Sequence, residues 1–436
     1  MTAAGAATRK LFGTDGVRGV AGEFLTAELA LALARAATAR VGAKRVLVIR
    51  DTRTSGEMLE AAVAAGIAAA GGEALLAGVL PTPGAPLLIR RYGFDIGVVL
   101  SASHNPYQDN GIKFFGGDGF KLSDATELEI EAMLAEPPVT VVDVGRVRRF
   151  HGALEDYLRA LHERFAGLDL SGRRILLDCA NGSTYEAAPE IFRRLGAHVD
   201  VIAATPDGRN INAGCGSTHV ETLQAAMAEG RHDAGFAFDG DGDRVLAVDR
   251  TGAVVDGDEL IALAAKHLKV TGVAVTVMTN YGFHAAMREA GIEVATTPVG
   301  DRYVLEALRE RGWELGGEQS GHIIDMGFVP SGDGIASALL AMEALGGGDL
   351  RERHAMQKLP QRLVNVRVRD RGALGTATEV HAAVEREAAA LEGRGRVLLR
   401  PSGTEPVVRV MVEAPTTDEA EIVCTRLVAL VESKLT

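Results

Sequence analysis

A serine-rich segment that follows a predicted strand is a candidate for nucleophilic chemistry. It runs Ser101-Ala-Ser-His-Asn-Pro-Tyr-Gln-Asp-Asn-Gly-Ile-Lys113 and begins where the strand predicted over 95–100 ends. In open α/β sheets, loops at the carboxyl ends of strands line the ligand crevice, so this segment is expected to be such a loop. The alternative is an ordinary turn, since Ser, Asn, Asp and Gly are common turn residues. A hydrolase triad is not expected from Ser103 and His104, because adjacent side chains should point apart and the chain has no GxSxG elbow.

Three aspartates alternate with glycines in a second segment, Asp239-Gly-Asp-Gly-Asp-Arg244, which follows a strand predicted over 233–238. Carboxylates at this spacing, separated by glycines that permit sharp turns, can converge on one hard divalent cation. An EF-hand is a poor match, because Arg244 stands where that loop requires Gly. A polar turn without an ion is disfavoured, since the three carboxylates would repel one another. Magnesium usually keeps an oxygen from phosphate or water, so the segment predicts a magnesium site beside a phosphorylated partner.

Two further segments suit a sugar and a phosphate. The segment Gly316-Gly-Glu-Gln-Ser-Gly-His322 offers a carboxylate, an amide, a hydroxyl and an imidazole, which suit sugar hydroxyls that both donate and accept hydrogen bonds. The segment Arg400-Pro-Ser-Gly-Thr-Glu-Pro406, with Arg409, combines guanidinium groups with hydroxyls and backbone N–H groups, as in a phosphate-sized anion nest. A plain loop and a hairpin turn are the alternatives, and the second leaves the paired arginines unexplained. Nucleotide use is unsupported, because the chain has no Walker A pattern and no convincing GxGxxG after a strand.

The elements that must position these segments are α/β units. Strand-length apolar runs alternate with helical-period segments, a pattern typical of βαβ units and parallel sheets. We predict α/β architecture, with three similar mixed α/β domains and a smaller C-terminal α+β domain with an antiparallel sheet. Strands are predicted at 45–50, 74–80, 95–100, 174–178, 199–203, 233–238, 273–278, 292–297, 364–368, 396–399 and 407–413, and helices at 57–70, 185–195, 219–229, 259–267, 303–312, 377–391 and 417–435. The predicted domains are 1–155, 156–256, 257–362 and 363–436.

Composition excludes several other classes. Among the 436 residues, 46 are Lys or Arg and 58 are Asp or Glu; the formal net charge of −12, without a basic block, argues against nucleic acid and membranes as partners. Hydrophobic residues at 47% exclude disorder as the dominant state. Cys179, Cys215 and Cys424 lack CxxC spacing, so neither a disulfide framework nor a zinc site is supported. A cytoplasmic location is expected, since no apolar run resembles a signal peptide or a membrane span.

Together, the four segments resemble those of the α-D-phosphohexomutase family, in the family's motif order and over nearly the whole chain. Residues 12–19, 210–219 and 299–304 and Gln319 resemble the phosphoglucosamine branch, whereas the phosphomannomutase and phosphoglucomutase branch typically has Met in place of Gln319. The resemblance implies four domains around a central cleft and interconversion of glucosamine 6-phosphate and glucosamine 1-phosphate. The alternatives are the same reaction on glucose or mannose phosphate, a metal-dependent sugar phosphatase and a non-catalytic sugar-phosphate sensor.

The resemblance also implies a role for each site residue. Ser103 would carry a phosphoryl group in the resting enzyme, and Asp239, Asp241 and Asp243 would hold Mg²⁺ together with an oxygen of that phosphoserine. Transfer to substrate O1 or O6 would give glucosamine 1,6-bisphosphate, which serves as intermediate and activator. The implied roles of the remaining residues are proton transfer and charge stabilisation (Lys113, Arg18), proximity to the reacting oxygen (His322), substrate binding (Glu318, Ser320, Arg244) and phosphate binding (Arg400, Ser402, Gly403, Thr404, Arg409). The implied partner is a phosphorylated amino sugar, and a homodimer is left open.

Overall fold

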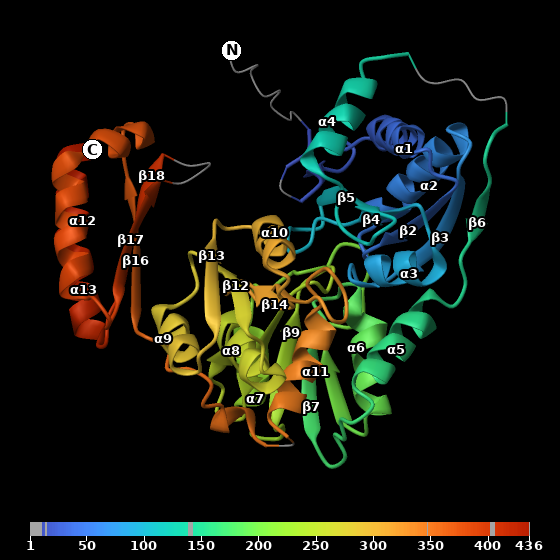
Figure 1. The fold of residues 1–436 in the computed structure, drawn as a ribbon. Helices are drawn as coiled ribbons and strands as arrows, with labels where there is room; N and C mark the ends of the chain where they lie inside the picture. Colours follow the sequence, from blue (N-terminus) through green and yellow to red (C-terminus); the bar gives the residue numbers. More distant parts are fainter. Residues whose placement is uncertain (1–10, 14, 138–142, 347, 402–405, 436) are drawn as a thin grey trace. The chain divides into compact units, whose positions relative to one another are not determined.

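The structure is a computed structural model that describes residues 11–13, 15–137, 143–346, 348–401 and 406–435. By internal contacts the chain forms two compact units. The first unit holds residues 1–277 and 295–353, and the second holds residues 278–294 and 354–436. Among the described residues the strands form four sheets. Figure 1 shows that helices flank them. None of the described helices is long and apolar enough to cross a membrane.

The first sheet has six strands in the order β1-β5-β4-β2-β3-β6. Its elements are β1 (Val17–Val20), α1 (Ala27–Val41), β2 (Arg45–Arg50), α2 (Ser55–Ala69), β3 (Glu73–Val79), α3 (Gly84–Tyr92), β4 (Ile96–Leu100), β5 (Asp109–Gly116), α4 (Asp124–Met133) and β6 (Val147–Arg149). Strands β2, β3, β4 and β6 pair in parallel, whereas β5 returns antiparallel to β4 and β1 pairs antiparallel with β5.

Helices cover both faces of this sheet, with α1, α2 and α4 on one side and α3 on the other (Figure 1). Val46 and Val48 of β2 belong to the same buried cluster as Leu33 of α1 and Val63 of α2. On the other face, a Cβ at Gly97 would lie 2.5 Å from Cδ1 of Ile89 in α3, so this helix packs directly on the backbone of β4. Burial of both faces explains why these strands consist of nearly continuous apolar residues.

The second sheet has the order β11-β10-β9-β7-β8. Its elements are α5 (Ala153–Arg164), β7 (Arg174–Asp178), α6 (Thr184–Arg194), β8 (His198–Ile202), α7 (Glu221–Met227), β9 (Ala234–Phe238), β10 (Val245–Asp249) and β11 (Val254–Val255). Strands β8, β7 and β9 are parallel, and β10 turns back antiparallel on β9 immediately after the aspartate segment. The site segments of both domains therefore lie in a connection between a parallel strand and an antiparallel neighbour.

The third sheet has the order β13-β12-β14-β15. Its elements in the first unit are α8 (Gly257–Leu268), β12 (Gly272–Thr276), β13 (Glu293–Thr297), α10 (Asp301–Arg311), β14 (Leu315–Gly317), β15 (Ile323–Asp325), α11 (Gly334–Ala344) and the short 3-10 helix η1 (Leu350–Glu352). Strand β14 is parallel to β12, and β15 is antiparallel to β14. The prediction of three similar mixed α/β domains is confirmed. Each of the three sheets combines parallel strands with at least one antiparallel pair at an edge.

The second unit contains an antiparallel sheet in the order β16-β18-β17, which confirms the predicted C-terminal α+β domain. Its elements are α9 (Tyr281–Glu289), β16 (Gln361–Arg367), the 3-10 helix η2 (Arg371–Thr376), α12 (Thr378–Ala390), β17 (Arg396–Pro401), β18 (Val407–Glu413) and α13 (Thr417–Leu435). Glu413 is fully buried and accepts hydrogen bonds from Arg396 Nε (2.7 Å), Tyr281 N (2.8 Å) and Asn280 Nδ2 (3.2 Å). A buried carboxylate thus joins α9 to the C-terminal sheet. The four domain boundaries expected from the sequence stay a prediction.

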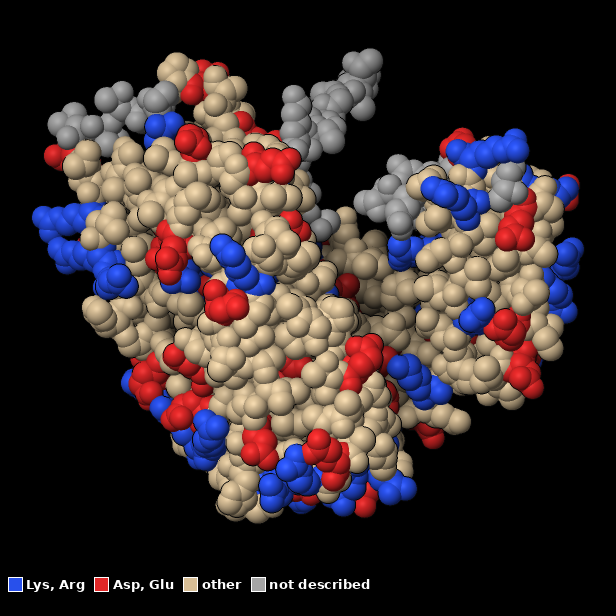
Figure 2. Space-filling model, turned by 180° about the vertical axis from the view of Figure 1, so that it is seen from behind, with Lys and Arg blue, Asp and Glu red and all other residues tan. Residues whose placement is uncertain are grey.

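Charged side chains of both signs are interspersed on the face shown in Figure 2. Several of the molecule's charged residues form exposed pairs, such as Arg40 with Glu129 and Arg426 with Glu387. Exposed pairs of this kind contribute little to stability. The site described below is formed instead by charged side chains that are buried in the first unit.

Candidate active site

Ser103 lies in the connection that follows β4 and has no exposed surface. Its φ of 51° is in the left-handed region, which residues other than glycine rarely adopt. In this conformation Ser103 Oγ donates a hydrogen bond of 2.6 Å to Asp239 Oδ2 and lies 3.3 Å from His104 Nδ1. The expectation that the side chains of Ser103 and His104 point apart was wrong, because it assumed an extended backbone.

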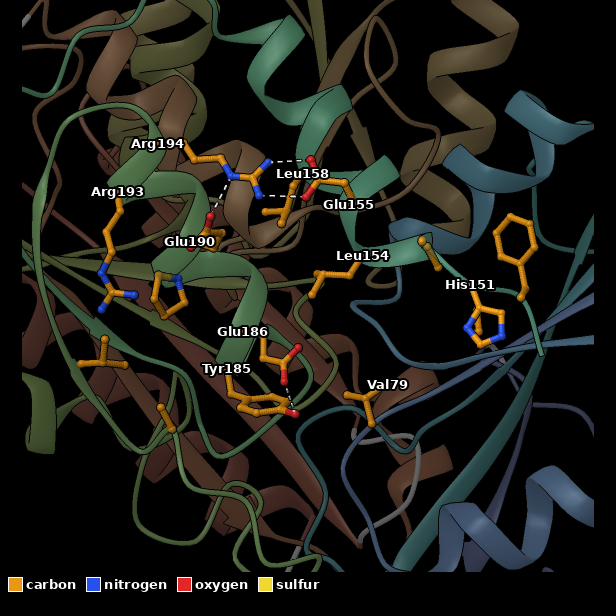
Figure 3. Close-up of a pocket in the computed structure, with 17 residues that line it drawn as sticks. Val79, His151, Leu154, Glu155, Leu158, Tyr185, Glu186, Glu190, Arg193 and Arg194 are labelled. Carbon is orange, nitrogen blue, oxygen red and sulfur yellow. Dashed lines mark hydrogen bonds and ion pairs between the residues drawn. The ribbon is translucent and has the colours of Figure 1, made fainter.

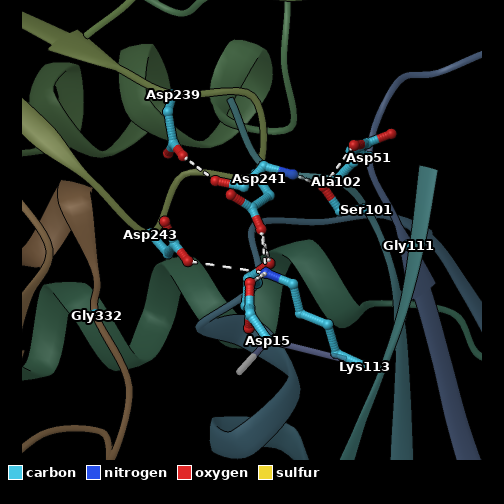
Figure 4. A network of polar contacts seen from close by, with 12 residues as sticks. Asp15, Asp51, Ser101, Ala102, Gly111, Lys113, Asp239, Asp241, Asp243 and Gly332 are labelled. Atoms are coloured by element: carbon cyan, nitrogen blue, oxygen red, sulfur yellow. Dashed lines mark hydrogen bonds and ion pairs between the residues drawn. The ribbon is translucent and has the colours of Figure 1, made fainter. Parts of the chain in front are cut away.

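The serine segment is shorter than predicted. Residues 109–116 form β5 rather than loop, so Lys113 is a strand residue opposite Val99 of β4. The antiparallel return brings the fully buried Lys113 side chain to the metal segment, where its Nζ lies 2.8 Å from Asp241 and 3.9 Å from Asp243 (Figure 4). A hairpin of this kind is not apparent from the segment's polar composition.

The three aspartates converge, as their spacing predicts. One carboxylate oxygen from each of Asp239, Asp241 and Asp243 lies within 4.8 Å of the others, and all three residues are buried. Gly240 is required here, because a Cβ at this position would lie 2.6 Å from the Ser103 carbonyl oxygen. Burial and the charges of Asp243 and Asp241 raise the pKa of Asp239 well above its ordinary value. The cluster therefore concentrates negative charge beside the serine hydroxyl.

Cations from the first domain face this acidic cluster. Lys113 Nζ also lies 3.0 Å from Asp15, and Arg18 forms an ion pair with Asp15 as well. Burial alone would lower the pKa of Lys113, but the charges of Asp15 and Asp241 raise it above its ordinary value. The same opposition of burial and nearby carboxylates raises the pKa of Arg18. Both side chains are therefore positively charged at neutral pH.

The sugar segment meets the metal segment. His322, at the start of β15, forms an isolated antiparallel bridge with Arg244, and its Nδ1 lies 3.6 Å from Asp243 Oδ2. Burial would lower the pKa of His322, but the charges of Asp243 and Asp301 raise it to about 9. Glu318 is buried and accepts a hydrogen bond of 3.1 Å from Gly300 N. The structure therefore brings His322 and Arg244 to the serine and its aspartates.

The other two side chains of this segment differ in exposure. Ser320 is exposed, with no hydrogen bond described for its hydroxyl. The Gln319 amide donates to Asp256 Oδ2 at 3.2 Å. Because Asp256 is the N-cap of α8, Gln319 braces the loop on this helix. This contact gives Gln319 a structural role.

Two of the predicted phosphate-binding residues can be placed, and they lie in the second unit. Arg400 of β17 and Arg409 of β18 are directly opposite each other in register. Burial and the charge of Arg409 lower the pKa of Arg400. Ser402, Gly403 and Thr404 lie outside the described residues. Like charges opposite each other are unfavourable, so a bound anion would stabilise this pair.

Several charged residues of the site were missed in the sequence. Lys121 is paired with both Asp15 and Asp301, and Asp301 lies 3.7 Å from His322 Nε2. A chain of alternating charges thus runs from Lys113 through these residues back to His322. Asp15 and Asp301 each stand beside glycine in segments that carry the resemblance, which was the available signal. No spacing connects Lys121 to either.

A separate cavity of about 890 Å³ lies between β3, the start of α5 and α6. Figure 3 shows that its charged side chains largely pair with one another: Arg194 with Glu155 and Glu190, and Tyr185 with Glu186. None of its lining residues belongs to the serine, aspartate or sugar segments. The cavity is therefore not part of the site.

Comparisons with known proteins show which family and which fold the chain shares. Four models of the phosphoglucomutase/phosphomannomutase family match the chain: alpha/beta/alpha domain I at residues 9–138, domain II at 155–252, domain III at 256–363 and the C-terminal domain at 363–430. Among solved structures, a phosphoglucomutase/phosphomannomutase family protein from Burkholderia thailandensis has a TM-score of 0.83 at 24% identity, covering 98% of both chains. The N-acetylphosphoglucosamine mutase of Aspergillus fumigatus, in complex with GlcNAc-6P and magnesium, has a TM-score of 0.69 at 19% identity, covering 98% of this chain and 96% of that one.

Curated relatives are closer in sequence. The phosphoglucosamine mutase of Moorella thermoacetica is 50% identical over 430 residues, which cover 94% of this chain and 97% of the relative. The phosphoglucosamine mutase of Deinococcus deserti is 49% identical over 438 residues, covering 98% and 99%. These matches cover nearly the whole chain and so include all four matched domains. The chain therefore belongs to the phosphoglucomutase/phosphomannomutase family and, within it, to the phosphoglucosamine mutases.

Proposed function

We propose that this chain interconverts glucosamine 6-phosphate and glucosamine 1-phosphate, with Ser103 carrying the transferred phosphoryl group. The observation that carries the proposal is the buried Ser103 hydroxyl, which donates to Asp239, one of three clustered carboxylates. Lys113 pairs with Asp241 of this cluster, and Arg18 Nη1 donates to the carbonyl oxygen of Ala102, the residue before Ser103. Membership of the phosphoglucosamine mutases supports the amino sugar as substrate.

The aspartate cluster fits a divalent cation. Asp241 Oδ1 and Asp243 Oδ1 are buried and have no hydrogen-bond partner among the described residues, so both oxygens are available to a metal. Three hard carboxylate oxygens match the preference of Mg²⁺. We assign the ion to Asp239, Asp241 and Asp243, with an oxygen of phosphorylated Ser103 completing the set. When bound, Mg²⁺ supplies positive charge that offsets the charge of the phosphoryl group during transfer.

The atoms and protons of each phosphoryl transfer balance without a further reactant. In the first, the bond from phosphorus to Ser103 Oγ breaks while a bond forms to O1 of glucosamine 6-phosphate. The substrate hydroxyl loses a proton, and Ser103 Oγ gains one. The resulting glucosamine 1,6-bisphosphate turns over and returns its other phosphoryl group to Ser103, which leaves glucosamine 1-phosphate. Added bisphosphate acts as an activator because it restores any Ser103 that has lost its phosphoryl group.

The protonation states of His104, Lys113 and Arg18 suit them to different roles. Burial and the charges of Arg244 and Arg18 lower the pKa of His104, so its imidazole is uncharged at neutral pH. Its Nδ1, 3.3 Å from Ser103 Oγ, can then exchange a proton with this oxygen. Lys113 and Arg18 keep their protons and stabilise the charge of the phosphoryl group. We assign His322 to the same charge stabilisation near the reacting oxygen. Exclusion of water from the fully buried Ser103 protects the phosphoserine from hydrolysis.

The remaining assignments concern the substrate. Glu318, Ser320 and Arg244 are proposed to bind the sugar. We propose that the phosphate that is not being transferred is bound by Arg400 and Arg409, which face each other, together with Ser402, Gly403 and Thr404. A cytoplasmic location is proposed on the grounds of composition.

The test is Ser103→Ala, with intact mass and phosphosite mapping. The wild-type protein should carry one phosphoryl group on Ser103 and convert glucosamine 6-phosphate when supplied with Mg²⁺ and bisphosphate. The variant should stay folded and bind Mg²⁺, since it loses one hydroxyl and little buried surface, yet its turnover should fall to background. Full turnover in the folded variant contradicts the covalent mechanism. Stoichiometric release of inorganic phosphate by the wild type would identify a phosphatase instead.

A further inference from the structure

Two side chains from different domains donate hydrogen bonds to the same pair of carbonyl groups in the serine loop. Arg53 Nη2 lies 2.8 Å from the carbonyl oxygens of both Ser103 and Asn105. Asn212 Nδ2 lies 2.9 Å from the first oxygen and 3.2 Å from the second. Arg53 follows β2 of the first sheet, and Asn212 lies between β8 and α7 of the second. The loop that carries the nucleophile is therefore held from both sides.

The Arg53 guanidinium is committed entirely to this loop and to one aspartate. The side chain has no exposed surface, and its Nε donates to Asp51 at 2.8 Å. Its Nη1 donates to the carbonyl oxygens of Pro106 and Asp109, the latter at 3.0 Å. Four loop carbonyls thus accept from one buried cation. Burying an arginine costs free energy of folding unless all its N–H groups donate hydrogen bonds, so a fully buried Arg53 indicates a specific structural role.

That task is to fix a backbone conformation that serine does not prefer. A left-handed φ for a residue other than glycine costs free energy and persists only where neighbours enforce it. At Ser103 the amide donates to Ser101 Oγ (2.9 Å), which in turn donates to Asp51 (2.6 Å). Both the N–H and the C=O of Ser103 are therefore anchored, the first through Asp51 and the second by Arg53 and Asn212.

We propose that Arg53 and Asn212 are positioning residues for phosphoryl transfer, which hold Ser103 Oγ at the aspartate cluster without touching the reacting atoms. The proposal rests on the proposed function of Ser103. Misplacement of a reacting group by about 1 Å can cost on the order of 100-fold in rate, although the substrate contacts are unchanged. Loss of either residue should therefore lower kcat and leave KM nearly constant.

The test compares three variants with a matched control. Asn212→Asp keeps the shape and the tolerance for a left-handed φ of 57°, but presents oxygens to both carbonyls. Asn212→Gly removes the donor and keeps the backbone permissive. Arg53→Lys keeps the positive charge beside Asp51 but loses the two Nη groups that donate to the loop carbonyls. The control is Thr52→Val, because the Thr52 hydroxyl donates at 2.6 Å to the Asn181 carbonyl, another buried hydrogen bond between the same two domains that does not involve the serine loop.

Four measurements are made on each protein: the thermal midpoint, kcat and KM for glucosamine 6-phosphate with saturating bisphosphate, and amide hydrogen exchange of peptides covering 101–109. We expect both Asn212 variants to lose 10- to 100-fold in kcat with KM within twofold, and to exchange faster at this loop. Thr52→Val should keep kcat and loop protection. Should Arg53→Lys fail to fold, the Asn212 pair decides.

Two results overturn the proposal. One is a kcat within twofold of wild type in both Asn212 variants, and the other is an equal loss of kcat in Thr52→Val. If the wild-type protein does not interconvert glucosamine phosphates, the proposed function fails rather than the positioning role. Loop exchange then decides the positioning role alone, and unchanged exchange in both Asn212 variants refutes it.

Discussion

Replacing Asp239 with asparagine should stabilise the metal-free protein and weaken its response to magnesium. The asparagine keeps the shape and can still accept the Ser103 hydrogen bond, but it removes one of three buried charges. It also removes the acceptor of a weaker hydrogen bond, the one of 3.2 Å from Arg244 N to Asp239 Oδ1. At 4.8 Å and an effective dielectric constant of about 20, each carboxylate pair repels by about 3.5 kcal/mol, and Asp239 takes part in two such pairs. Lys113 and Arg244 offset most of this repulsion, so we expect a net gain of about 1 to 3 kcal/mol, which is roughly 1 to 4 °C in Tm for a unit of this size.

Magnesium should cancel most or all of this difference in stability. At a concentration 100 times its Kd, Mg²⁺ stabilises the wild type by about 2.7 kcal/mol. If the loss of one ligand raises Kd about 100-fold, the variant gains only about 0.4 kcal/mol at the same concentration. Thermal unfolding in EDTA and in Mg²⁺ measures both effects. The reasoning is refuted if Asp239→Asn is no more stable than wild type in EDTA, or gains as much from Mg²⁺.

Asp178→Asn is the matched control. Asp178 is also buried at the end of a strand of the second sheet, but its two oxygens accept from backbone N–H groups of Ala180 (2.9 Å) and Gly216 (2.8 Å). Asparagine offers only one acceptor oxygen, so one of these N–H groups would be left unsatisfied. This variant should lose about 1 to 3 kcal/mol, with or without Mg²⁺.

Three further predictions concern other parts of the first unit and the substrate. Lys121→Met leaves two half-buried aspartates without their shared cation, although Asp15 keeps Lys113 and Arg18, and should cost about 1 to 3 kcal/mol in chemical unfolding. Adding Asp301→Asn should restore part of that loss. Burial raises the pKa of Asp333 from 3.8 to about 7, so its stabilising contribution is present below about pH 4 and lost as pH rises through 7. This loss, on the order of 4 kcal/mol, should be absent from the pH–stability profile of Asp333→Asn. Finally, one charge-assisted hydrogen bond to the 2-ammonium group should favour glucosamine 6-phosphate over glucose 6-phosphate by roughly 5- to 150-fold in kcat/KM, and equal values would contradict this selectivity.

Prediction from the sequence worked best where the spacing of residues within one short segment determines how their side chains are arranged. Asp239, Asp241 and Asp243 alternate with glycines directly after a strand, so their convergence follows from local chain geometry, and the structure brings them within 4.8 Å. The strands of the parallel sheets were found for a similar reason, because burial on both faces makes each one continuously apolar.

Contacts between distant segments were not predictable in the same way. Lys113 was assigned to a loop because Asp109 and Asn110 resemble turn residues, whereas pairing with β1 makes these two residues the start of β5 and Lys113 itself pairs with Val99 of β4. The closeness of Ser103 and His104 depends on a left-handed φ, and Arg53 and Asn212 enforce this φ from segments about 50 and 109 residues away. Periodicity and turn propensity do not contain this information.

The burial of Glu413 limits how the chain can be cut into independently folding pieces. A fragment that begins at His354 would keep this carboxylate and Arg396 but would leave Asn280 and the Tyr281 amide on the other fragment. The carboxylate would then have lost the Asn280 and Tyr281 donors and kept only Arg396, and the peptide that begins α9 would have lost its acceptor. A fragment designed to contain the C-terminal sheet should therefore carry residues 278–294 as well, joined by a designed linker to residue 354. Its solubility and cooperative unfolding would then report on the sheet rather than on an exposed, half-satisfied carboxylate.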